Sequence, residues 1–137
     1  MRQRLPVILA ALWWGSATAV GAWVVPMLFA HLGSPAQAGA MAAKLFAAQT
    51  WVAMVCGLLL LLTLRRQSEA SPREVLVHSG WVLAGMMGAL LLDAVAAPRI
   101  LAREQLALWH SVGTGLYALQ ALCAGVVLWR LSRASAF

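Results

Sequence analysis

Four long apolar stretches dominate this sequence and constrain what it can fold into. They occupy residues 5–30, 36–64, 73–97 and 106–129, and each is long enough to cross a bilayer as a helix of about 20 residues. A helix is required because a segment in lipid must pair its backbone polar groups internally. Of the 137 residues, 63% are hydrophobic and only 10% are charged, which excludes an ordinary soluble domain. The sequence predicts one all-α domain, an integral membrane antiparallel four-helix bundle.

The ends of these stretches carry helix-boundary residues. Ser34 and Pro35 form an N-cap followed by proline at the first helical position, so the second helix is expected to begin there. Ser71 and Glu74 have capping-box spacing and are expected to open the third helix. Pro98 is expected to end that helix, because proline disfavours a helical conformation in the residue before it. The apolar run after the basic N-terminus is longer than a signal peptide's, which predicts an uncleaved first span.

Basic residues divide unequally between the two sides of the predicted bundle. Three lie on the side away from the termini: Lys44, Arg99 and Arg103. Seven lie on the side of the termini: Arg2, Arg4, Arg65, Arg66, Arg73, Arg130 and Arg133. The positive-inside rule therefore predicts that both termini are cytoplasmic, in a multi-pass protein of the bacterial inner membrane. The net charge of +6 then reflects topology, with the lipid bilayer as partner and no nucleic acid.

Small residues recur at four-residue spacing on the third and fourth predicted helices. They are Gly80, Ala84 and Gly88, then Ser111 with Gly115, and Ala121 with Gly125. Such residues let helices approach closely in lipid, so these faces are expected to pack the bundle or to join copies into a homo-oligomer. Cys56 and Cys123 lie inside apolar runs and are expected to be small buried hydrophobic residues.

Polar residues gather near the predicted outer ends of the helices. On the last helix, His110, Thr114 and Tyr117 share one face with small residues, which predicts a funnel with a polar mouth open to the outer side. The predicted ligand-binding residues of this mouth are Asp93, His110, Ser111, Lys44, Gln49, Arg99, Thr114 and Tyr117.

Asp93 admits two interpretations, since ionisable residues within spans are costly and tend to be functional. In the structural one, which we favour, it faces the bundle and pairs with Arg99, Lys44 or His110. In the functional one, it lines a cavity and binds a cation, a proton or a polar headgroup. If it is paired, Asp93→Leu is expected to destabilise the protein by leaving a buried charge without a partner.

A metal site is a further hypothesis for the same mouth. Met27, His31 and His110 would offer soft ligands to copper, and a bis-histidine haem would use His31 and His110. Copper and haem are thus the cofactors under consideration, and neither is strongly implied. His78 lies near the opposite end of its helix, at the wrong depth to share a haem with His110.

Several segments also carry a family resemblance. "WWGSATAVGAWVVPMLFAHL", "AGAMAAKLFAAQTWVAMVCG" and "LWHSVGTGLYALQALCAG" resemble a bacterial family of four-span proteins of unknown function related to vertebrate transmembrane protein 205. That resemblance implies a four-span fold and no specific reaction, although the vertebrate relative is associated with metal-drug export. The chain is more distantly similar to four-span copper-resistance proteins and HemJ-type protoporphyrinogen oxidases. Those oxidases carry a histidine in the first helix and a lysine in the third, which this chain lacks before His31 and between residues 73 and 97.

Three functions follow from these observations. The first is a non-enzymatic protein that binds or passes a small ligand, a metal or a lipid through the outer mouth. The second is a membrane oxidoreductase that uses haem or porphyrin, and the third is a structural subunit of a larger membrane complex. The sequence contains no phosphate-binding loop, HExxH motif or nucleophile elbow, so an enzymatic role is the less favoured one.

Overall fold

Helices joined by short turns make up the structure described here, a computed structural model that covers residues 4–66 and 72–134. No strand occurs within these two ranges. The elements are α1 (Arg4–Ala19), η1 (Val20–Val24), α2 (Val25–His31), α3 (Pro35–Arg66), α4 (Pro72–Leu91), η2 (Leu92–Ala96), α5 (Ala97–Leu101) and α6 (Leu106–Ala134). Because η1 and η2 are π-helical turns within continuous helices, the elements form four rods. All four rods are long and apolar enough to cross a membrane, which makes this a multi-pass membrane protein.

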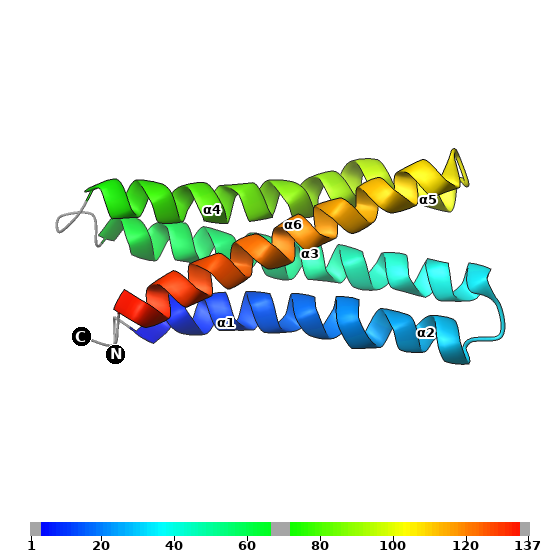
Figure 1. The fold of residues 1–137 in the computed structure, drawn as a ribbon, viewed down its shortest axis with the longest axis horizontal. Helices are drawn as coiled ribbons and strands as arrows, with labels where there is room; N and C mark the ends of the chain where they lie inside the picture. The colour runs from blue at the N-terminus through cyan, green and yellow to red at the C-terminus, as the bar shows by residue number, and fades with distance from the viewer. Residues whose placement is uncertain (1–3, 67–71, 135–137) are drawn as a thin grey trace.

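The four rods lie lengthwise beside one another (Figure 1). The start of α1 and the end of α6 lie at one end of the molecule, which we call the proximal end. We call the other the distal end, and it holds α2, the start of α3, α5 and the start of α6. α6 packs along α4 and α1, whereas α2 packs on α3. In Figure 1, α6 crosses the molecule obliquely, so its first half lies beside α5 and away from α2.

The first boundary of α3 follows the predicted capping pattern. Pro35 is the first helical residue, and the Ser34 hydroxyl accepts a hydrogen bond of 3.2 Å from the Gln37 backbone N–H. The expected N-cap is therefore confirmed. α4 begins at Pro72, and Ser71 of the predicted capping box lies outside the described residues.

The prediction that Pro98 ends its helix is wrong, because a wide π-helical turn accommodates the proline. The Ala97 N–H donates to the carbonyl of Leu92, five residues back, and the helix continues through Pro98 to Leu101. Proline lacks an N–H and clashes with the carbonyl four residues before it, and a widened turn relieves that conflict. The same arrangement precedes Pro26, where the Val25 N–H donates to the Val20 carbonyl.

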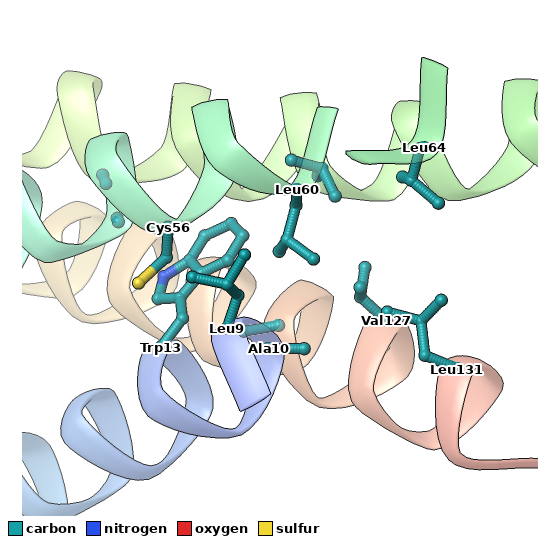
Figure 2. Close-up of a cluster of buried hydrophobic side chains, with 12 residues drawn as sticks. Leu9, Ala10, Trp13, Cys56, Leu60, Leu64, Val127 and Leu131 are labelled. Atoms are coloured by element: carbon teal, nitrogen blue, oxygen red, sulfur yellow. The ribbon is translucent and has the colours of Figure 1, made fainter. Parts of the chain in front are cut away.

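The apolar core lies in the proximal half (Figure 2). Leu9, Ala10 and Trp13 of α1 meet Cys56, Leu60 and Leu64 of α3 and Val127 and Leu131 of α6. The Trp13 indole packs against Gly85, where an added Cβ would lie 2.8 Å from the ring. Gly85 therefore leaves room on α4 for the Trp13 indole, which reaches it from α1.

Some of the predicted small-residue faces pack inside the molecule, and others do not. An added Cβ at Gly88 would lie 3.2 Å from the Leu116 carbonyl oxygen, and one at Gly125 would lie 2.9 Å from Trp14 Nε1. These two glycines therefore bring helices together as expected. The remaining outward positions are Gly80, Ala84, Ser111 and Gly115. Cys56 and Cys123 are buried free thiols, which confirms their predicted place in the core.

Candidate ligand cavity

A cavity of about 530 Å³ lies between the rods in the distal half. This volume falls within the range of small-molecule pockets, roughly 300–1,000 Å³. The wall residues come from all four rods: Ala17, Thr18, Gly21, Ala22, Val25 and Phe29; Gly39, Ala42, Ala43 and Phe46; Leu92, Ala97, Ile100 and Leu101; His110, Gly113, Thr114, Tyr117, Ala118 and Ala121. Most are apolar and many are small, so the cavity suits a ligand that is largely hydrocarbon.

Small side chains keep this space open. Gly39 lies on the wall, and a Cβ added there would meet no atom within 4 Å. The space beside Gly21 is filled, because the Tyr117 ring lies where a Cβ on residue 21 would be. The tyrosine thus packs tightly on η1 and leaves the space in front of Gly39 unfilled.

Four wall residues supply side-chain polar groups. The Tyr117 hydroxyl donates to the Ala17 carbonyl at 2.6 Å, and its ring lies 5.0 Å from that of Phe46 at a tilt of 54°. The Thr114 hydroxyl donates to the His110 carbonyl at 2.8 Å and keeps lone pairs for a further donor. Thr18 is the third. The His110 imidazole makes no hydrogen bond or ion pair with residues 4–66 or 72–134, so its nitrogens are available to a ligand.

A layer of interhelical hydrogen bonds lies next to the inner end of the cavity. Gln49 Nε2 donates to the Ser16 hydroxyl at 3.1 Å, and Ser16 donates to the Trp13 carbonyl at 3.0 Å. The Thr50 hydroxyl shares its proton between the Phe46 carbonyl of its own helix, at 3.0 Å, and the Ala89 carbonyl of α4, at 3.3 Å, and so links α3 to α4. Gln49 is only 3% exposed and does not line the cavity, so in this structure it holds helices together beneath the predicted mouth.

Asp93 lies in η2 and is half-buried, but it does not line the cavity. Within the described ranges it forms no ion pair, so the predicted pairing with Arg99, Lys44 or His110 is wrong. Arg99 instead stacks over the Trp109 ring, 4.2 Å from its centroid. The helix continues beyond Pro98, and Arg99 therefore does not fold back toward the carboxylate.

The other predicted residues divide between wall and surface. His110, Thr114 and Tyr117 line the cavity, whereas Lys44 and Ser111 are exposed outside it. Ser111 donates to the carbonyl of Ala107 on its own helix at 2.9 Å. The last helix therefore carries the part of the predicted mouth that the structure brings together.

Of the three predicted metal ligands, one lines the cavity. Met27 and His31 are exposed on α2 and do not line the cavity, whereas His110 does. His31 Nδ1 donates to the Met27 carbonyl at 3.0 Å. Over the ranges 4–66 and 72–134, no group of three or more His, Cys, Asp or Glu residues forms a metal site. Copper or haem binding by Met27, His31 and His110 stays a prediction.

Sequence reasoning missed the walls on α3 and η1. Gly39 and Ala43 stand four residues apart in "AGAMAAK", and Thr18 and Ala22 repeat that spacing. This small-residue pattern was the available signal. It does not reveal whether such a face packs against another helix or borders an empty space, because that depends on how α6 diverges from α2.

Comparison with known proteins gives a family but no activity. No curated protein and no solved structure matches the chain. A family model described as "Domain of unknown function (DUF4149)" matches residues 8–107, from α1 to the first residues of α6. This agrees with the resemblance to a family of unknown function, and it gives no evidence for a relation to transmembrane protein 205 or to copper-resistance proteins. Because the match covers most of the length of the chain, the chain belongs to the DUF4149 family of domains of unknown function.

Proposed function

We propose that this protein binds a small amphipathic molecule in the distal cavity, within the inner membrane of a bacterium. The observation that carries the proposal is the cavity of about 530 Å³, which is mostly apolar and lies between rods that are able to span a membrane. Such pockets, with a few convergent polar groups, are the default binding-site hypothesis in a protein without a known ligand.

The position of the bilayer is supported by two tryptophans of α6, each stacked under an arginine, one from α5 and one from α6. Arg99 lies over Trp109 and Arg133 over Trp129, each 4.2 Å from the ring centroid. The two tryptophans are separated by a length of about 30 Å at 1.5 Å per residue, which is the hydrocarbon thickness. Tryptophan and arginine at such a spacing are typical of the two interfaces. With cytoplasmic termini in an antiparallel bundle, the cavity lies in the outer leaflet.

The ligand is expected to lie with its hydrocarbon part against Gly39, Ala43 and Phe46. Its polar end then meets the free imidazole of His110 and the Thr114 hydroxyl. An apolar molecule is already solvated in lipid, so burial alone supplies little selectivity. The shape of the cavity and the polar contacts at His110 must supply it.

A photoactivatable decanol tests this proposal on the detergent-solubilised protein. We expect labelling of Ala42, Ala43 and Phe46 that excess decanol suppresses. Gly39→Leu fills the open space and is expected to abolish this labelling. Gly115→Leu is the matched control, because Gly115 is exposed on α6, outside the cavity, and its added Cβ meets no atom within 4 Å.

Two results would contradict the proposal. One is wild-type labelling confined to outward residues such as Leu58 and Leu59. The other is cavity labelling that Gly39→Leu leaves unchanged while the variant stays folded by circular dichroism. The haem-linked oxidoreductase and the subunit of a larger complex stay predictions, since no contact among the described residues favours either.

A further inference from the structure

The cavity has exposed residues along two of its edges. On the first rod these are Thr18, Ala22 and Phe29, and on α6 they are His110, Thr114 and Ala118. Each of the six is both exposed and part of the wall, while the wall residues Ala42 and Gly113 are buried. The cavity therefore opens sideways, between the first rod and α6, through an opening that we call the lateral slot.

The packing of the helices explains why this slot is not closed. α6 packs along α1 in the proximal half, but its first half lies beside α5 (Figure 1). α2 packs on α3 instead. The two edges of the slot thus diverge toward the distal end, and the small side chains of Ala22 and Ala118 fill less of the gap than larger ones would.

The dimensions of the slot correspond to one leaflet. Ala118 lies near the middle of α6, and His110 lies next to Trp109 at the distal interface. The helical rise gives about 12 Å between them, close to half of a hydrocarbon core of about 30 Å. The edge on the first rod carries the Thr18 hydroxyl. Along the α6 edge, the slot is apolar at its deep end, at Ala118, and the Thr114 hydroxyl and the His110 imidazole lie toward its interfacial end. This is the polarity of a lipid, with its chain inward and its headgroup at the surface.

We infer that the occupant is a lipid of the distal leaflet, which inserts one acyl chain sideways through the lateral slot while its headgroup stays at the interface near His110. This inference rests on the proposed function, because it requires the cavity to bind a ligand. It adds the class of ligand and the route of entry: the ligand arrives from the bilayer and does not cross the aqueous phase.

The test uses the full chain in phosphatidylcholine vesicles that contain a phosphatidylcholine with a diazirine at the end of one acyl chain. Bulk lipid reaches the outside of every rod, so labelling of Leu58 or Leu59 is the internal standard. We expect additional labelling of Ala42 and Ala43, which only a chain inside the cavity can reach. Ala118→Trp is expected to reduce this inner labelling at least fivefold, and Ala11→Trp, on an exposed position outside the cavity, is the matched control.

The decanol experiment separates failure of this inference from failure of the proposed function. If decanol labels Ala42 and Ala43 but the acyl-chain probe labels only outward residues, the cavity binds a ligand and the inference about lipid is overturned. If neither probe reaches these residues, both proposals fail. If Ala11→Trp lowers inner labelling as much as Ala118→Trp does, entry through the lateral slot is also overturned.

Discussion

At the scale of single residues, three polar side chains in the middle of the rods join one helix to another, whereas His110, near the distal interface, stays free. Tyr117, Gln49 and Thr50 each donate to a group on another helix. The His110 imidazole has no such partner among the described residues. In the interior of a bilayer an unpaired polar group is costly, so a free imidazole is best tolerated beside the interface.

Tyr117→Phe tests the strongest of these contacts. The change removes the hydrogen bond of 2.6 Å to Ala17 and keeps the ring on Gly21 and Phe46. We expect a loss of about 0.6–1.7 kcal/mol in the free energy of unfolding, the usual range for interhelical hydrogen bonds in membranes. Denaturation by sodium dodecyl sulfate measures it. Thr63→Val is the control, because Thr63 bonds only to Leu60 on its own helix, and an equal loss there would refute the interhelical contribution.

Asp93→Leu tests the corrected view of this carboxylate. Asp93 has no ion-pair partner among the described residues. Removing its carboxylate therefore does not leave a lysine, arginine or histidine of these residues unpaired. The change also removes an ionisable group from within a span. We expect an unchanged or higher melting temperature in detergent, with Asp93→Asn close to wild type. A destabilisation of about 3–5 kcal/mol, typical of a broken buried ion pair, would show instead that Asp93 is paired.

At the scale of elements, the two proline-associated wide turns shape opposite walls of the cavity. η1 contributes Gly21 and Ala22, and η2 contributes Leu92. The sequence predicted all four rods and the start of α3. It did not predict the π-helical turns, because a proline alone does not show whether a helix ends or widens around it.

Pro98→Ala tests this role of the wide turn. Alanine restores an N–H and removes the clash, so the helix is free to return to regular α geometry. We expect greater stability, by up to about 3 kcal/mol, since proline is disfavoured by that amount inside a helix. Return of the turn to α geometry would rotate the helix after the turn relative to the helix before it by about 100°, the angle that one residue takes up in an α-helix. Wall residues would then face a different direction, so decanol labelling of the cavity is expected to fall.

Pro35→Ala is the matched control for this experiment. Pro35 occupies the first turn of α3, where no helical N–H bond is missing, so little change is expected in stability or labelling. A Pro98→Ala variant that is less stable than wild type, or that labels equally well, would contradict the account of η2.

At the scale of the whole molecule, the sequence was sufficient for the all-helical class and the four membrane-spanning stretches, because both follow from apolar length. Of the residues predicted for the candidate site, the ones that line the cavity are all on α6, where polar residues interrupt an apolar helix. The other walls consist of glycine and alanine, and these look alike in sequence whether they pack a core, as Gly88 does, or border a cavity, as Gly39 does. The oblique path of α6 decides between the two, and it depends on packing along the full length of the bundle.

The central claim is that the distal cavity is continuous with lipid, and a nitroxide attached at Ala43→Cys tests it most directly. The label is placed in a chain whose native Cys56 and Cys123 are replaced by alanine, reconstituted in phosphatidylcholine vesicles. Collision rates with oxygen and with a water-soluble nickel chelate are then measured by electron paramagnetic resonance. We predict high oxygen and low nickel accessibility, as at the lipid-facing control Gly115→Cys. High nickel accessibility would mean a water-filled cavity, low accessibility to both would mean a closed core, and either result would contradict the claim.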